Sequence, residues 1–156
     1  LSPIANGASR VFWGWFSDRM GREITMAFAF GVQALCLLAV LTVGKTSPAM
    51  FTVTLVLTFF TWGEVYSLFP STVGDYFGSR NAASNYGLVY TAKGVAAILG
   101  GWIAPLINEQ FGSWDSVFYG SAILAAIASI GALVLRASPL PKKAVHGETV
   151  TASVAR

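Results

Sequence analysis

Long apolar stretches are the feature that most limits how this chain can fold. Four of them have at least 20 residues and a fifth has 17; in chain order they are residues 1–17, 24–43, 49–69, 86–108 and 115–136. A helix needs about 20 apolar residues to cross the hydrocarbon layer of a membrane. Because that layer offers no water to backbone N–H and C=O groups, each stretch is predicted to be helical. The sequence therefore predicts an all-α integral membrane protein that spans the lipid bilayer five times.

The composition excludes most soluble functions. Hydrophobic residues make up 54% of the chain and charged residues only 11%, whereas soluble domains carry about 25% charged residues. The net charge of +3 is scattered between apolar stretches, so a nucleic-acid partner is excluded. Cys36 and His146 are the only cysteine and histidine, so neither a disulfide nor a metal centre is expected. With no enzyme motif in the sequence, we expect a protein that is not an enzyme and holds no cofactor.

Basic residues between the stretches predict the orientation in the membrane. If every stretch spans, one side holds segments 18–23 and 70–85 and the C-terminal tail, and the other side holds segments 44–48 and 109–114. The first side carries seven basic residues and the second carries one, Lys45. Such a bias marks the cytoplasmic side. The segment 137–156 is then a cytoplasmic tail, and it is predicted to be disordered because it has two prolines and no apolar periodicity.

A short motif lies between the first two stretches. Residues 14–22 read G-W-F-S-D-R-M-G-R, which resembles the cytoplasmic G-x-x-x-D-R-x-G-R motif of the major facilitator superfamily. The matching positions are Gly14, Asp18, Arg19, Gly21 and Arg22. Glycine at the first position allows close helix packing, the aspartate can cap or pair at a helix end, and the second glycine permits a tight turn. The two arginines hold the loop in the cytoplasm.

The resemblance implies a numbering for the helices. In that superfamily the motif also follows the second helix of each six-helix half. The five stretches then correspond to helices eight to twelve of a twelve-helix transporter. The short first stretch and the odd number of spans fit a longer protein, whose missing N-terminal half would be the partner of this part.

Three charged residues lie inside the stretches, away from their ends: Arg10, Glu64 and Lys93. A charge in mid-membrane costs at least about 2.5–3.5 kcal/mol, so such residues usually face a cavity or a partner. Arg10 precedes Asp18 by eight residues and Lys93 follows Asn85 by eight, which places each about 12 Å deep at 1.5 Å per residue. Two cations near the midplane predict a substrate site, since transporters bind their substrates there.

Aromatic residues accompany these cations. Trp62 and Tyr66 are four residues apart and share a helix face, and Tyr90 precedes Lys93 by three residues. Aromatic walls around cations suit a small, flat organic anion, whose edges meet the charges while its faces meet the rings. Glu64 is offset by two residues from both Trp62 and Tyr66, so we expect it to point elsewhere, as a structural partner or a gate.

Four runs strongly resemble the oxalate/formate antiporters within that superfamily. They are N-G-A-S-R-V-F-W-G-W-F-S-D-R-M-G-R-E at 6–23, F-F-T-W-G-E-V-Y-S-L-F-P at 59–70, D-Y-F-G-S at 75–79 and N-Y-G-L-V-Y-T-A-K-G at 85–94. The resemblance implies that Arg10 and Lys93 bind carboxylates and that Trp62, Tyr66 and Tyr90 line the cavity. It also implies exchange of oxalate for formate by alternating access, across the inner (plasma) membrane of the cell.

Two other functions remain open from the sequence. One is a proton-coupled monocarboxylate symporter of the same superfamily. Such carriers place a proton-carrying aspartate one turn before the arginine of helix eight, where this chain has Asn6, which cannot titrate. Glu64 or the missing half could still supply a proton site. The other is a transporter-like sensor, which would bind its ligand without moving it.

The orientation is testable with a reporter fused after Arg156. Because the basic residues place the tail in the cytoplasm, a reporter that works only in the cytoplasm should be active there. A reporter that works only on the opposite side should be silent. Activity of the second reporter alone would overturn the orientation and the helix numbering that depends on it.

Overall fold

The computed structural model describes residues 2–78 and 80–138, and these residues form α-helices joined by short connections. The elements are α1 (Ser2–Met20), α2 (Arg22–Thr42), the 3₁₀ turn η1 (Gly44–Thr46), α3 (Pro48–Trp62), α4 (Val65–Phe77), α5 (Ala82–Phe111) and α6 (Asp115–Ala137). The predicted all-α class is confirmed. The predicted disordered tail, apart from Ala137 and Ser138, lies outside the described residues.

Four of the predicted spans are confirmed as helices long and apolar enough to cross a membrane. They are Arg22–Thr46, Pro48–Phe77, Ala82–Phe111 and Asp115–Ala137. The first predicted stretch, residues 1–17, is helical in α1 but is not among these four. The second of the four consists of two helices, α3 and α4, separated by Gly63 and Glu64. The prediction of a continuous helix over residues 49–69 is therefore wrong at these two residues.

The two loops that were predicted to be cytoplasmic are shorter than expected. Residues 18–23 are almost entirely helical, and Gly21 alone separates α1 from α2. The backbone φ of Gly21 is 90°, a value that residues with a Cβ rarely adopt. The predicted role of Gly21 in a tight turn is therefore confirmed. The predicted loop 70–85 is also mostly helical, because α4 continues through Pro70 to Phe77. In a membrane helix, nearby hydroxyls can satisfy groups that a proline frees.

Small residues hold the most closely packed pair of helices together. Where α2 meets α6, Ala27, Ala122 and Ala132 are buried, and the Ser129 hydroxyl donates to the Ala27 carbonyl at 2.6 Å. Small side chains let membrane helices approach closely, which is how such helices gain packing energy in lipid. At the end of this pair, Lys45 after α2 forms an ion pair of 2.5 Å with Asp115 at the start of α6.

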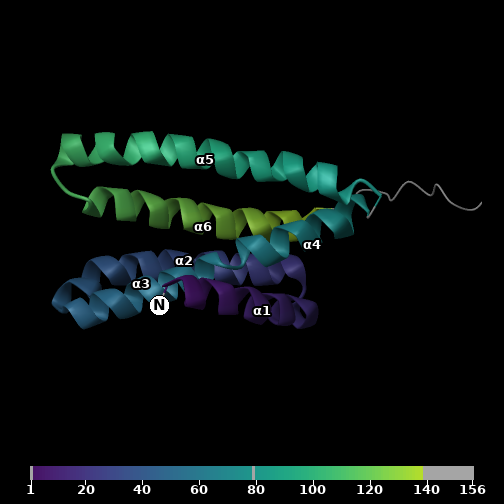
Figure 1. Cartoon of the computed structure of the whole chain (residues 1–156), viewed down its shortest axis with the longest axis horizontal. Coiled ribbons are helices and arrows are strands. Elements are labelled where there is room, and N and C mark those ends of the chain that lie inside the picture. The colour runs from purple at the N-terminus through teal and green to yellow at the C-terminus, as the bar shows by residue number, and fades with distance from the viewer. Residues whose placement is uncertain (1, 79, 139–156) are drawn as a thin grey trace, which may run out of the picture.

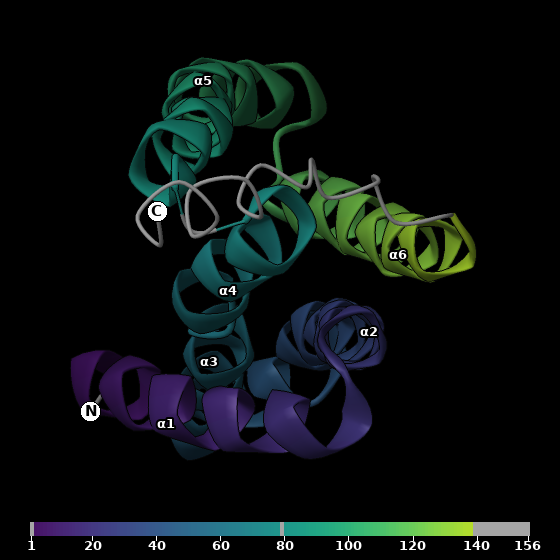
Figure 2. The same cartoon turned by 90° about the vertical axis from the view of Figure 1, so that its right-hand side faces the viewer.

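Helix α5 lies at the edge of the described helices. Figure 1 shows α5 and α6 as an antiparallel pair, with α5 on the outside. Viewed along the long axis, α4 stands between α5 and the layer of α1, α2 and α3, and α1 crosses that layer obliquely (Figure 2). No residue of α5 is buried, and its main contacts are with α4 and α6.

The closest approach between α1 and the third span occurs at Gly63. A Cβ at this position would lie 2.8 Å from the Asn6 carbonyl oxygen and would overlap the hydroxyl of Ser9, which is fully buried. The Ser9 hydroxyl could rotate away, but the Asn6 carbonyl is backbone of α1 and cannot move without moving that helix. Position 63 therefore accepts glycine alone.

We predict that Gly63→Ala destabilises the full-length protein in detergent, because overpacking typically costs about 1–3 kcal/mol. The measurement is thermal unfolding with Gly120→Ala as the matched control. A Cβ at Gly120 meets nothing within 4 Å of the described residues, so this change should leave the melting temperature equal or higher. Equal melting temperatures for the two variants would contradict the close approach.

Candidate functional site

The structure brings the five residues of the predicted substrate site together: Arg10, Lys93 and Trp62 contact the Tyr66 ring, and Tyr90 contacts Lys93. The Arg10 guanidinium carbon of α1 lies 4.2 Å from the Tyr66 ring centroid. The Lys93 ammonium of α5 lies 4.0 Å from the same centroid. Both are cation–π contacts, which are strengthened where water is excluded. Two cations from helices far apart in the sequence therefore meet on one aromatic side chain.

The depth argument is consistent with this meeting, although the helix ends differ from the predicted ones. Arg10 lies ten residues before the end of α1 at Met20, and Lys93 lies eleven residues after the start of α5 at Ala82. At 1.5 Å per residue these positions are about 15 and 17 Å along their helices. The two side chains thus remain at similar depths.

Aromatic residues surround the Lys93 ammonium. It donates hydrogen bonds to the Tyr66 hydroxyl and, at 3.3 Å, to the Tyr90 hydroxyl. It lies 5.4 Å from the Trp62 ring centroid and 5.2 Å from that of Tyr90. Trp62 and Tyr66 meet edge to face with centroids 5.6 Å apart. The three rings therefore form a partial cage that fixes the position of the ammonium.

No carboxylate in the described part of the chain forms an ion pair with Arg10 or Lys93. Arg10 instead donates to the side-chain oxygen of Asn6 at 3.2 Å. Glu64 is only 1% exposed, and its Oε2 has no hydrogen-bond partner in the described residues. Glu64 therefore does not neutralise the positive charge of Arg10 and Lys93.

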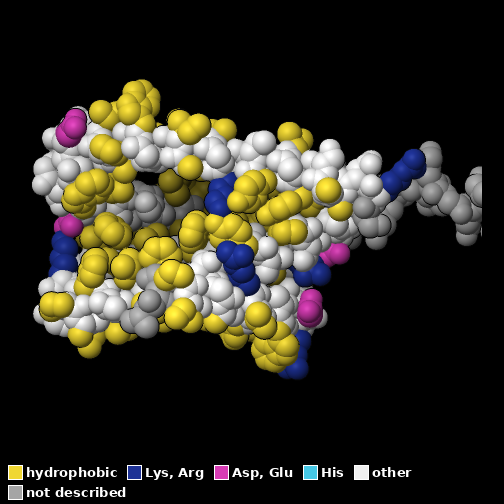
Figure 3. All heavy atoms as spheres, viewed as in Figure 1, with side chains coloured by type: hydrophobic (Ala, Val, Ile, Leu, Met, Phe, Trp, Pro, Cys, Tyr) yellow, Lys and Arg dark blue, Asp and Glu magenta, His cyan; other side chains and the backbone are white. Residues whose placement is uncertain are grey.

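The cluster is open on one side. Trp62 is 41% exposed and Tyr90 45%, and a cavity of about 260 Å³ between α4 and α5 includes Tyr90 and Lys93 in its lining. Figure 3 shows basic side chains at mid-length of a face that is otherwise rich in apolar side chains, whereas the acidic side chains of that face lie toward its ends. Because Trp62 and Tyr90 are exposed beside the Lys93 ammonium, a small anion can reach this side of the cluster.

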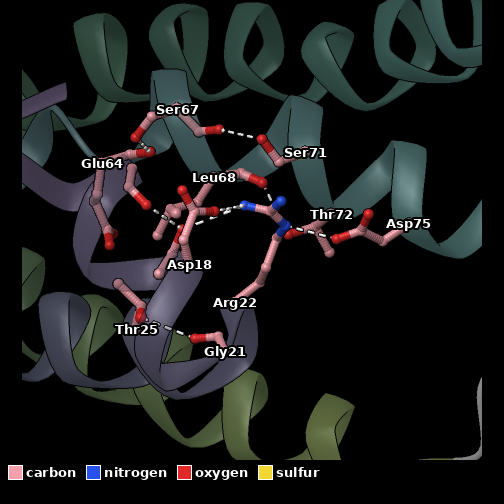
Figure 4. A network of polar contacts seen from close by, with 12 residues as sticks. Asp18, Gly21, Arg22, Thr25, Glu64, Ser67, Leu68, Ser71, Thr72 and Asp75 are labelled. Carbon is pink, nitrogen blue, oxygen red and sulfur yellow. Dashed lines mark hydrogen bonds and ion pairs between the residues drawn. The ribbon is translucent and has the colours of Figure 1, made fainter. Parts of the chain in front are cut away.

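The loop motif forms a second cluster at the end of α1. The Arg22 Nε donates to Asp75 of α4 at 2.6 Å, and its Nη1 lies 3.6 Å from Asp18 and 3.2 Å from the Ser17 hydroxyl. Figure 4 shows Arg22 reaching between Asp18 and Asp75, with the Glu64 side chain pointing away from this group. The Tyr76 hydroxyl adds a hydrogen bond to Glu23 at 3.0 Å. The motif thus ties the start of α2 to the end of α4.

Two other motif residues, Arg19 and Gly14, lie outside this cluster. Arg19 lies over the Trp15 ring at 4.1 Å from its centroid, so it contacts its own helix. Gly14 was predicted to allow close helix packing, but a Cβ there would meet nothing within 4 Å among the described residues. Close packing at Gly14 therefore stays a prediction, and the close approach of α1 that the described residues show falls at Gly63.

Sequence reasoning missed the break at Gly63 and Glu64 beside Trp62 and Tyr66. The available signal was a glycine followed by an acid in the middle of an apolar stretch. It also missed Asn6 as a contact of Arg10. Asn6 lies one turn before Arg10 on the same face of α1, which is the spacing at which helical side chains meet.

Comparison with known proteins identifies the family. Residues 1–155 match the family model of the Major Facilitator Superfamily. The chain belongs to the Major Facilitator Superfamily. It is 41% identical over 128 residues to the oxalate:formate antiporter of Oxalobacter formigenes, covering 82% of this chain and 30% of that protein. The predicted resemblance to that antiporter family is confirmed, and with four helices able to span a membrane the chain is a multi-pass membrane protein.

Other relatives are more distant. The chain is 30% identical over 95 residues to apicoplast pyruvate carrier 2 of Toxoplasma gondii, covering 60% of this chain and 15% of the carrier. It is 33% identical over 95 residues to the uncharacterized MFS-type transporter YhjX of Escherichia coli, covering 61% of this chain and 23% of that transporter. The chain spans less than a third of the length of each of these relatives.

We predict a measurable coupling between Arg22 and Asp75. Their side chains are 27% and 58% exposed, so solvent screens the pair and a double-mutant cycle should give about 0.2–1 kcal/mol, smaller at high salt. The cycle compares unfolding of Arg22→Ala, Asp75→Ala and the double variant in the full-length protein. The control cycle pairs Arg19→Ala with Asp75→Ala and should be additive. Equal coupling in both cycles would show that the ion pair contributes nothing specific.

Proposed function

We propose that this protein is an antiporter that exchanges small carboxylates, oxalate for formate, by alternating access. The observation that carries the proposal is the pair of cations, Arg10 and Lys93, on the Tyr66 ring with no carboxylate partner in the described residues. Similarity to an oxalate:formate antiporter supports the same substrate class.

The residues have distinct proposed roles. A guanidinium presents a planar fork that matches a carboxylate, whereas an ammonium is a compact point charge. Arg10 would grip one carboxylate of oxalate and Lys93 would hold the other. Trp62, Tyr66 and Tyr90 would pack against the faces of the flat dianion, which suits rings better than a branched substrate. No bond is made or broken during transport.

Repulsion between the cations explains why transport would be an exchange. Both groups lie within 4.2 Å of one ring centroid. Two unit charges about 8 Å apart repel by about 2 kcal/mol at an effective dielectric constant of 20. A bound dianion removes this repulsion and favours the occluded state, while an empty site resists closing. Since a ligand shifts a conformational equilibrium only by its differential affinity, the loaded carrier would cross and the empty carrier would not.

The placement in the whole protein is part of the proposal. The described helices would be helices eight to twelve of a twelve-helix fold, with the N-terminal half completing the cavity over the open face. The C-terminus and the Arg22–Asp75 cluster would lie in the cytoplasm, and the membrane would be the inner (plasma) membrane. Rocking of one half against the other around a midplane site is the general mechanism of such carriers.

A proton-coupled monocarboxylate symporter is the second candidate. One observation favours it, namely that Glu64 is buried and has an oxygen without a partner in the described residues. The two functions differ in what drives uptake. An exchanger needs a counter-anion inside the vesicle, and a symporter needs a pH gradient. Binding without any flux would instead indicate a sensor.

We predict that Lys93→Gln abolishes oxalate exchange by the full-length protein in liposomes, because the dianion loses one of its two counter-charges. Arg10→Lys should impair exchange through loss of the planar fork. Removing one cation should harm a dianion more than a monoanion, so residual activity should shift toward formate. The matched control is Lys45→Gln, a surface lysine paired with Asp115. Wild-type oxalate exchange by both Lys93→Gln and Arg10→Gln would leave the antiporter without its site.

A further inference from the structure

The break in the third span frees two backbone carbonyls. In an unbroken α-helix the amides of Gly63 and Glu64 would donate to the carbonyls of Phe59 and Phe60, four residues earlier. Here the Gly63 amide is directed to the Thr61 carbonyl, and the Glu64 amide donates to the same carbonyl at 3.5 Å. The carbonyls of Phe59 and Phe60 therefore lose their α-helical donors at a depth where water is scarce.

Two side chains of α1 supply the missing donors. The Asn6 amide nitrogen donates to the Phe59 carbonyl at 3.3 Å. The Trp13 indole nitrogen donates to the Phe60 carbonyl at 3.0 Å, and Trp13 is only 2% exposed. Asn6 and Trp13 are seven residues apart, two helical turns, so they project from one face of α1. Because unsatisfied backbone groups are costly in lipid, these contacts favour the broken form.

Asn6 also contacts the proposed substrate site. While its amide nitrogen donates to the Phe59 carbonyl, its amide oxygen accepts from Arg10 at 3.2 Å. Trp62 directly precedes the break and Tyr66 lies just beyond it. The side-chain amide of Asn6 therefore contacts both the break and Arg10. The break separates Trp62 from Tyr66, and Arg10 lies over the Tyr66 ring.

We propose that Asn6 and Trp13 are positioning residues that hold the third span in its broken form and thereby set the geometry of the anion site. The effect on binding and transport rests on the proposed function, whereas the effect on the shape of the span does not. When these donors are absent, the amides of Gly63 and Glu64 can return to Phe59 and Phe60, and the span straightens. Trp62 and Tyr66 then move relative to Arg10.

The shape of the span is measurable in the full-length protein in nanodiscs. Spin labels at Phe51 of α3 and Phe77 of α4, which are 44% and 60% exposed, report its end-to-end distance once every native cysteine, Cys36 included, has been replaced by serine. Trp13→Phe deletes the N–H and keeps a ring against Phe16, Phe28 and Phe60, which Trp13 contacts. We expect this variant and Asn6→Ala to shift the distance upward, toward the roughly 39 Å of a straight helix of that length.

Binding of labelled oxalate and exchange are measured on the same variants. We expect about fivefold weaker binding for Trp13→Phe, the scale of one net hydrogen bond, with a raised KM and an unchanged maximal rate. The two variants should be non-additive in a double-mutant cycle because they act on one break. The matched control is Trp15→Phe on the same helix, whose ring is 51% exposed; it should change neither distance nor affinity.

Two results would overturn the proposal. One is an unchanged label distance in both variants, which would mean that Asn6 and Trp13 do not hold the break. The other is a shifted distance with unchanged oxalate affinity, which would separate the break from the site. If the wild type binds no oxalate, the antiporter proposal fails, while the distance measurement still decides whether these residues shape the span.

Discussion

Two positive charges on one aromatic ring, with no described carboxylate to neutralise them, dominate the energetics of this structure. A charge in mid-membrane is costly wherever it is placed, and here the cost is met by rings and dipoles. The Tyr66 ring takes both cations, the hydroxyls of Tyr66 and Tyr90 accept from Lys93, and the Asn6 amide accepts from Arg10. Partial charges of this kind soften the repulsion without removing it. A bound anion can therefore add a large favourable electrostatic contribution to the free energy of binding, which is the physical basis of the proposed specificity.

The helices on either side of this cluster are built in different ways. The pair of α2 and α6 is packed through buried alanines and closed by the Lys45–Asp115 ion pair, so it behaves as a stiff unit. By contrast α5, which carries Lys93 and Tyr90, has no buried residue and lies at the edge. In the proposed twelve-helix protein, this edge is where the N-terminal half would pack.

Much of the fold could be predicted from the sequence because a segment that crosses lipid must be apolar, helical and about 20 residues long. Apolar length alone located four spans, and residue counting from helix ends placed Arg10 and Lys93 at similar depths. The ends of the helices could not be predicted as well, since Pro70 stops helices in soluble proteins but is tolerated inside α4. The break at Gly63 was missed for another reason. It depends on donors from Asn6 and Trp13, residues more than 45 positions away, and no local pattern reports such contacts.

The two contacts between α2 and α4 differ in kind from a single ion pair. Arg22 and Glu23 are consecutive, and so are their partners Asp75 and Tyr76. Consecutive residues on a helix project about 100° apart, so the contacts grip α4 on two sides of its axis. Two contacts on different sides of the axis resist rotation of the end of α4 about that axis as well as its separation from α2. Any torsion that transport imposes on this span must then be absorbed at the other end of α4, beside Glu64.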